Sequence, residues 1–415
     1  MAMTRPEPQA ALMCCPITEA DISRWPEHIR ERIERGQPRV LEGAEAGVQV
    51  YDHAQHGVRD SAPVQHYLLH SIERPQQGRC SRPLDDLELV QRAIAHTHMT
   101  VTLLTCIGQK LDCRLLERMA MRQMARNLQT LVLEDCCIAD QDVGFIAAGL
   151  SRLVGREPMS KLRALALTNN FITAKGAEHL AAALQNATCL EDLYLDWNRL
   201  GSQGCTFIAA ALKCNTSLKL LHMAANDLRD AGIISLADAL KGQAGLTDLD
   251  LTTDNVTATG ATALADMLRV NSTLCSLSLN GNSIGAAGGC ALAAALNQCN
   301  STLGTLCVDS CDATTDVFIQ MATSLRSPAC GLSSFSASRN AAHDAGALAV
   351  AHALGSNTML TKLRLARCGI SEEALSDILQ VAGSVGNLLE LDVRDNAGQD
   401  RSFFLHNPHA NKRRF

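Results

Sequence analysis

The chain has 415 residues, of which 47% are hydrophobic, 19% are charged and only 3% are aromatic. This composition excludes a mostly disordered chain, which needs less apolar content and more net charge. The net charge of −6 gives no electrostatic case for binding nucleic acid or an anionic membrane. No run approaches the roughly 20 apolar residues that span a bilayer, and the first residues lack the apolar segment of a secretory signal.

The same survey predicts no metal, no cofactor and no catalytic residue. Seventeen cysteines are present, but their spacing matches no zinc-binding pattern. No glycine-rich stretch ends in the Lys-Ser/Thr of a phosphate-binding loop, and no serine or cysteine lies in a recognisable nucleophile motif. The cysteines are interpreted as small buried thiols in a reducing compartment, the cytoplasm.

The N-terminal part of the chain shows no repeat. Residues 1–82 are predicted to form a loop-rich, partly disordered leader with short helices on either side of Pro26. Residues 83–127 are predicted to contain an amphipathic helix and a degenerate first repeat, which together cap the N-terminal end of a repeat array.

From residue 128 to residue 396 one pattern recurs, Leu-x-x-Leu-x-Leu-x-x-(Asn/Cys)-x-(Leu/Ile). The alternating leucines predict a short strand with one buried face, and the alanine-rich second half of each unit predicts a helix. We therefore expect an α/β solenoid, a horseshoe with parallel strands on the concave face and helices on the convex face. Residues 397–415 are expected to form a C-terminal cap and a basic tail. After a first copy at Leu128, the first leucines follow in steps of 28 or 29 residues: Leu162, Leu190, Leu218, Leu246, Leu274, Leu303, Leu332, Leu360 and Leu388.

Two further positions recur with the repeat. The ninth position ends the strand, so its side chain is expected to hydrogen-bond to backbone groups of neighbouring repeats. Asn-x-Thr/Ser triplets match N-glycosylation acceptors but fall at one point of successive repeats, so we interpret them as turns from helix into strand. The triplets begin at Asn186, Asn215, Asn271 and Asn300. The ninth-position residues are Cys136, Asn170, Asn198, Asn226, Asp254, Asn282, Cys311, Asn340, Cys368 and Asn396.

The repeat unit, with its Gly-Ala-x-x-Leu-Ala-x-Ala-Leu helix and Asn-x-Thr/Ser-Leu junction, resembles the ribonuclease-inhibitor type of leucine-rich repeat over residues 100–396. The phrases Gly176-Ala-Glu-His-Leu, Gly260-Ala-Thr-Ala-Leu and Gly346-Ala-Leu-Ala also resemble the GALA-type effectors that plant-pathogenic bacteria inject into host cells. Similar phrases occur in animal immune receptors and in the Ran GTPase-activating protein. The resemblance implies a protein-binding scaffold, with a role as a virulence effector in a host cytoplasm among its candidate functions.

The concave face carries the candidate binding residues, because the residues that flank the buried leucines point outward. An acidic stretch surrounds two aromatic residues and a histidine, and a basic end follows. An aromatic side chain on a rigid surface is typical of a binding hot spot, and segregated charge would orient a partner of complementary polarity. We predict a monomeric, non-enzymatic scaffold that binds a protein partner on this face. The predicted residues are Glu134, Asp135, Asp192, Tyr194, Asp196, Trp197, His222, Asp248, Asp250, Lys362, Arg364 and Arg367.

Two alternative functions stay open from the sequence. In the first, the N-terminal region recruits a ubiquitin ligase or an immune-signalling component while the horseshoe selects the target. The Leu-Pro and downstream Trp pattern of an F-box is not found in residues 1–98. In the second, the protein is a GTPase-activating protein resembling the Ran regulator, although the chain lacks the acidic tail usual there.

Overall fold

The computed structural model describes residues 48–52, 64–70, 100–107, 128–150, 161–185, 187–298, 300–397 and 404–406. The chain divides into two compact units, Met1–Gly108 and Gln109–Phe415. Of the helices that the described residues form, none is long and apolar enough to cross a membrane.

The smaller unit contains three described strands. Strand β1 (Val48–Asp52) pairs antiparallel with β2 (Val64–His70), and β2 pairs parallel with β3 (Thr100–Ile107). Strands β1 and β2 lie within residues 1–82, for which the loop-rich leader with short helices stays a prediction. Valine and tyrosine, which favour strands, occur in both of them. The helices expected between residues 1 and 98 lie outside the described residues.

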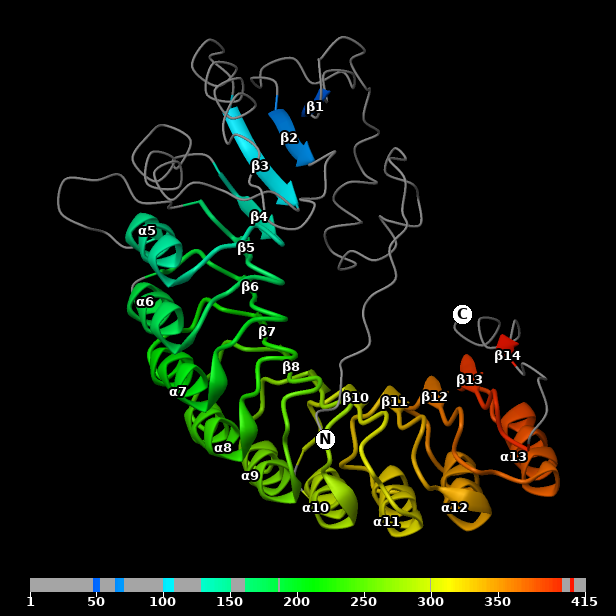
Figure 1. The fold of residues 1–415 in the computed structure, drawn as a ribbon. Helices are drawn as coiled ribbons and strands as arrows, with labels where there is room; N and C mark the ends of the chain where they lie inside the picture. The colour runs from blue at the N-terminus through cyan, green and yellow to red at the C-terminus, as the bar shows by residue number, and fades with distance from the viewer. Residues whose placement is uncertain are drawn as a thin grey trace, which may run out of the picture. The chain divides into compact units, whose positions relative to one another are not determined.

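The larger unit is built on one open sheet of ten parallel strands, which neighbour one another in chain order. Figure 1 shows the strands along the inner side of an arc and the helices along its outer side, as predicted. The strands are β4 (Thr130–Glu134), β5 (Ala164–Ala166), β6 (Asp192–Tyr194), β7 (Leu220–His222), β8 (Asp248–Asp250), β9 (Ser276–Ser278), β10 (Thr305–Cys307), β11 (Ser334–Ser336), β12 (Lys362–Arg364) and β13 (Glu390–Asp392).

A helix follows each of these strands from β4 to β12. A final strand, β14 (Phe404–His406), pairs antiparallel with β13 at the C-terminal end of the sheet. The helices are α5 (Asp140–Leu150), α6 (Ala174–Leu184), α7 (Gly201–Leu212), α8 (Arg229–Leu240), α9 (Ala258–Leu268), α10 (Gly285–Gln298), α11 (Thr315–Leu325), α12 (His343–Leu354) and α13 (Glu372–Ser384).

The core is a set of leucine rows that run along the stack. All nine first-position leucines from Leu162 to Leu388 are at most 4% exposed. The strands pair without a shift, so that Leu193, Leu221 and Leu249 lie in one row. Burial of each such side chain contributes about 1.5–3 kcal/mol, and the constant repeat length keeps the rows continuous.

The ninth-position side chains form the expected ladder. Asn198 donates from Nδ2 to the carbonyls of Leu167 and Leu195, both at 2.9 Å, and its Oδ1 accepts the N–H of Ile172 at 3.0 Å. Where cysteine replaces asparagine at positions 311 and 368, Sγ donates to the corresponding carbonyl of the preceding repeat. The prediction of an inter-repeat ladder is confirmed.

The Asn-x-Thr/Ser junctions form a second set of contacts between repeats. Asn215 is buried, donates from Nδ2 to the carbonyl of Leu184 at 2.7 Å, and accepts the N–H of Leu218 at 2.9 Å. Asn271 and Asn300 make the equivalent bonds. These three amides are turn residues, as expected, and their burial leaves no room for a glycan; Asn186 lies outside the described residues.

Candidate protein-binding surface

Strands β6, β7 and β8 bring most of the predicted acidic residues together. Asp192, Leu220 and Asp248 form one row across the sheet, and Tyr194, His222 and Asp250 form the next. Adjacent strands lie about 4.8 Å apart, so that the acids of β6 and β8 flank β7 at a separation of roughly 10 Å. We call these rows, together with Asp196 in the turn after β6, the acidic patch.

The aromatic and imidazole groups lie inside this patch. The rings of Tyr194 and His222 meet edge to face, with centroids 5.0 Å apart. Tyr194 is only 2% exposed, so its ring is not offered to a partner as the sequence led us to expect. Burial lowers the pKa of His222, although Asp250 and Asp248 oppose this shift. The imidazole is therefore largely neutral at pH 7 and does not cancel the acidic charge.

Asp196 is the acid of the patch whose pKa changes most. Burial raises its pKa to about 7; a hydrogen bond from Ala224 lowers it, and the charges of Asp250 and Glu134 raise it. Its Oδ2 lies 4.0 Å from Nδ1 of His222. Because the imidazole is neutral, this contact is not a fixed ion pair at neutral pH.

Trp197 follows Asp196 in the turn beyond β6 and is the most exposed large hydrophobic residue of the described chain, at 65%. Its backbone is in the left-handed region, with φ 57°, and its N–H donates to the carbonyl of Ala224 at 2.8 Å. The same edge presents Phe171, which is 48% exposed, and the Arg199 guanidinium lies 5.1 Å from the centre of its ring. An aromatic edge therefore borders the acidic patch.

Glu134 and Asp135 lie at the end of β4 and are separated from β6 by β5, whose outward residues are alanines. Burial raises the pKa of both carboxyl groups, and the charge of Asp135 raises that of Glu134 further. The charge of Glu134 in turn raises the pKa of Asp196. These two acids extend the negative potential of the acidic patch without contacting its rows.

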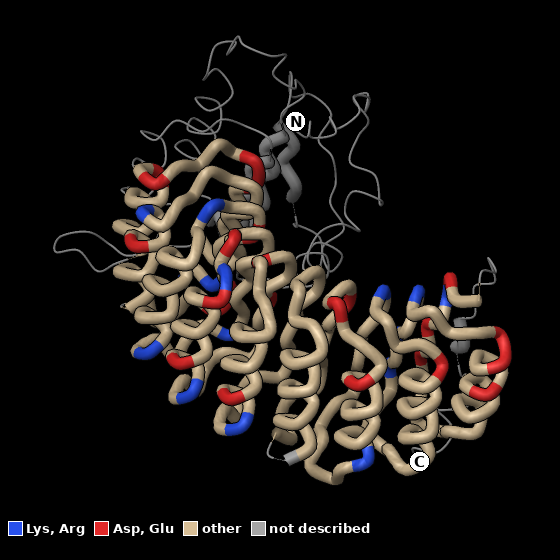
Figure 2. Tube along the Cα trace, turned by 60° about the horizontal axis from the view of Figure 1, so that its bottom comes forward, with Lys and Arg blue, Asp and Glu red and all other residues tan. Residues whose placement is uncertain are grey.

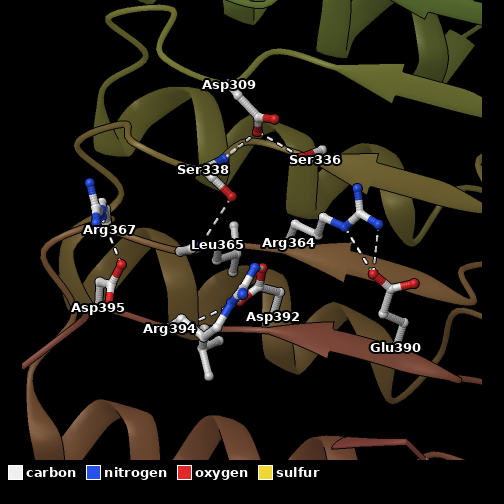
Figure 3. Close-up of polar contacts among 12 residues, drawn as sticks. Asp309, Ser336, Ser338, Arg364, Leu365, Arg367, Glu390, Asp392, Arg394 and Asp395 are labelled. Carbon is white, nitrogen blue, oxygen red and sulfur yellow. Dashed lines mark hydrogen bonds and ion pairs between the residues drawn. The ribbon is translucent and has the colours of Figure 1, made fainter. Parts of the chain in front are cut away.

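The seventh position of the repeat, two residues before the ladder position, has a structural role that sequence reasoning missed. Backbone N–H groups of the sixth and eighth positions donate forward to the next repeat, as those of Leu195 and Trp197 do. The N–H of the seventh position points back to the preceding repeat. The chain of that repeat has already left the strand at this level, so no strand carbonyl accepts the N–H. A seventh-position side chain of that preceding repeat accepts it instead, over 2.6–3.2 Å: Asp196 for Ala224, Asn280 for Asp309, Asp309 for Ser338 and Ser338 for Ala366. Figure 3 shows the contact of Ser338 with Asp309.

Two repeats have alanine at the seventh position, and an aspartate compensates in both. Ala224 cannot accept the N–H of Thr252, which donates instead to Oδ1 of Asp250 at 2.9 Å. Ala366 cannot accept the N–H of Arg394, which donates to Oδ1 of Asp392 at 3.2 Å. The sequence carried a signal for this compensation: an alanine at position seven is followed by an aspartate at position five of the next repeat. Asp196 and Asp250 therefore stabilise strand ends as well as carrying charge.

The basic end is less cationic than its sequence indicates. Lys362 lies 3.9 Å from the carboxylate of Glu390. Arg364 lies 2.7 Å from the same carboxylate, and Arg367 lies 2.8 Å from Asp395 (Figure 3). Figure 2 shows both signs of charge close together along the strand edge of these last repeats. Exposed pairs of this kind contribute about 0–1 kcal/mol, but they occupy the charges that we expected to face a partner. Among the described residues no His, Cys, Asp and Glu side chains gather in a group that could hold a metal ion.

Comparison with known families agrees with the fold. A family model described as Leucine Rich repeat matches residues 186–209, 214–237, 270–293 and 356–379. The chain folds as a leucine-rich-repeat solenoid. No curated protein matches the sequence of this solenoid.

Solved structures with leucine-rich repeats resemble the chain at low sequence identity. The yeast Rad7 and Elc1 complex is 17% identical, with a TM-score of 0.49, over 74% of this chain and 73% of that one. An internalin from Listeria monocytogenes is 21% identical, with a TM-score of 0.42, over 70% and 73%. The tropomodulin C-terminal domain of Caenorhabditis elegans is 12% identical, with a TM-score of 0.30, over 43% and 90%.

Proposed function

We propose that this protein is a non-enzymatic scaffold that binds a partner protein on the concave surface of β6–β8. The partner presents a positively charged segment to the acidic patch and an apolar or aromatic group to Trp197. The observation that carries the proposal is the exposed indole of Trp197, held by a backbone hydrogen bond at the border of the patch. Such rigid, exposed tryptophans are typical of interface hot spots.

The distribution of ion pairs supports a cationic partner. At the last repeats Lys362, Arg364 and Arg367 are paired with carboxylates of the following repeat. Within the described repeats, no lysine or arginine forms an ion pair with Asp248 or Asp250. Complementary charge raises the rate of association and selects the partner more than it adds raw affinity.

The test begins with cross-linking and mass spectrometry of the full chain to identify the partner, followed by calorimetric titration. Truncation of a hot-spot tryptophan costs about 2 kcal/mol, so Trp197→Ala should raise Kd by about 30-fold. Val270→Ala is the matched control, because Val270 is 61% exposed just beyond α9, and it should leave Kd unchanged. Asp248→Asn should weaken binding most at low salt, since the surface charge is screened at high salt. An unchanged Kd for Trp197→Ala would refute the proposal.

The proposal includes a role as an effector acting in a host cell. This part rests on the resemblance of the helix phrases that begin at Gly176, Gly260 and Gly346 to GALA-type effectors; the three glycines lie in α6, α9 and α12. A fusion of the full chain to a translocation reporter tests it in a bacterium that injects such effectors. Failure of the fusion to enter host cells would refute the effector role and leave the binding test separate.

A further inference from the structure

One residue of the asparagine ladder is an acid. Asp254 follows β8, is 0% exposed, and accepts the N–H of Asn226 on Oδ1 at 2.7 Å. Its second oxygen, Oδ2, has no hydrogen-bond partner, and no other buried side-chain nitrogen or oxygen of the described residues shares this property. An orphaned buried oxygen is costly unless it acquires a partner.

The neighbouring ladder residues show which groups Oδ2 faces. Every ladder asparagine donates from Nδ2 to the sixth-position carbonyls of its own repeat and of the preceding repeat. Asn226 donates to Met223 at 2.8 Å, and Asn282 donates to Leu251 at 2.8 Å. Because the repeats are equivalent, the carbonyls of Met223 and Leu251 are the two groups to which an asparagine at position 254 would donate. Oδ2 of Asp254 therefore faces these two carbonyls. An ionised carboxylate would oppose two carbonyl oxygens there, whereas a protonated one donates a hydrogen bond.

The charged groups around Asp254 also favour the neutral form. Burial raises its pKa to about 8; the N–H groups of Asn226 and Leu228 lower it, and the charges of Asp250 and Asp196 raise it. The remaining titratable neighbour is Cys205 of α7, a buried thiol whose pKa is raised by burial and by Asp254 itself. The ladder neighbours on either side, Asn226 and Asn282, are uncharged. No cation stabilises the carboxylate from any of these elements.

We propose that Asp254 holds a proton in the folded protein and donates a hydrogen bond through it to the carbonyl groups of the ladder, so that the joint between the repeats of β7 and β8 weakens as pH rises from acid through neutrality. The sign follows from linkage. An unfolded aspartate has a pKa of about 3.9, so between pH 4 and pH 8 the folded chain keeps a proton that the unfolded chain has lost. The free energy of unfolding therefore falls as pH rises through this window and levels off above it.

The test compares the full-length parent with Asp254→Asn, whose amide completes the ladder at every pH. The folding equilibrium constant of the variant relative to the parent should increase by about tenfold per pH unit from pH 5 toward pH 8 and then become constant. Asp248→Asn, which removes an acid that is not in the ladder, should run parallel to the parent. A ratio for Asp254→Asn that does not change with pH would overturn the proposal.

Two further measurements keep the proposal testable if Asp254→Asn does not fold. The reciprocal variant Asn340→Asp places an acid in a ladder position between two cysteines, and it should acquire the same loss of stability toward pH 8. Infrared spectra of Asp196→Asn, which removes the other acid that ionises near pH 7, should show a protonated carboxyl band at pH 6.5 that is lost above pH 9. A protonated ladder aspartate would be contradicted if the stability of Asn340→Asp had the same pH dependence as that of the parent. It would also be contradicted if the infrared band were absent.

Discussion

Replacement of Asp309 by alanine should expose the role of the seventh-position contacts. Oδ1 of Asp309 accepts the N–H of Ser338 at 2.6 Å and the hydroxyl of the buried Ser336 at 2.7 Å (Figure 3). Loss of the carboxylate leaves both donors without an acceptor. A hydrogen bond to a charged group contributes about 1.5–3 kcal/mol, so we expect Asp309→Ala to lower the free energy of unfolding by about 3 kcal/mol.

The compensation seen elsewhere in the chain supplies a rescue. In the Asp309→Ala background, Ser336→Asp recreates the alanine and aspartate arrangement of Ala224 with Asp250. The new carboxylate should accept the N–H of Ser338 as Asp250 accepts that of Thr252. About 2 kcal/mol should be recovered, because the N–H regains its acceptor while the hydroxyl of Ser336 is gone.

Hydrogen exchange is the appropriate assay, since long repeat arrays depart from two-state unfolding. Exchange of the Ser338 amide should accelerate by about 150-fold in Asp309→Ala, the equivalent of about 3 kcal/mol, and should slow again in the double variant. The control is Ser336→Ala in the same Asp309→Ala background. Unchanged exchange in Asp309→Ala, or equal exchange in the rescue and its control, would refute the seventh-position role.

Two further predictions concern the ladder and the acidic patch. Asn198→Ala should lower the opening free energy of its repeat by about 3 kcal/mol in hydrogen exchange, because the carbonyls of Leu167 and Leu195 lose their shared donor and the N–H of Ile172 its acceptor. Equal stability of variant and parent would contradict this. Since Asp196 ionises near pH 7, affinity for a cationic partner should rise between pH 6 and pH 8, as measured by calorimetry. Asp196→Asn should flatten that rise; a pH-independent parent would be inconsistent with a role for Asp196.

The sequence predicts the fold closely because its strongest signal is periodic. Leucines recurring every 28 or 29 residues can be buried together only if strands stack in register, and Leu193, Leu221 and Leu249 do so. The limit is visible at Asp196, which we expected to point outward from a strand. Strand β6 ends at Tyr194, so Asp196 lies in the turn, where its carboxylate meets a backbone N–H of the next repeat.

The candidate site was less predictable because its properties depend on contacts between neighbouring repeats. The sequence placed Arg364 and Glu390 in adjacent strands, but only side-chain geometry shows that they form an ion pair at 2.7 Å. The same holds for Tyr194, whose outward position does not reveal that its ring is buried against His222. A periodic pattern fixes which residues share a row, whereas rotamers determine which of them are left for a partner.

This distinction decides which substitutions can report on binding. Asp196 and Asp250 each accept a backbone N–H, so truncating either would disturb a strand end together with the charge. Substitution of either by alanine would therefore confuse lost binding with lost structure. Trp197 contributes its backbone, not its indole, to the hydrogen bond with Ala224, and Asp248 accepts only the neighbouring Thr247 hydroxyl among its described contacts. The acidic patch can thus be tested without altering the solenoid only through these two residues and through aspartate-to-asparagine changes that keep the acceptor oxygen.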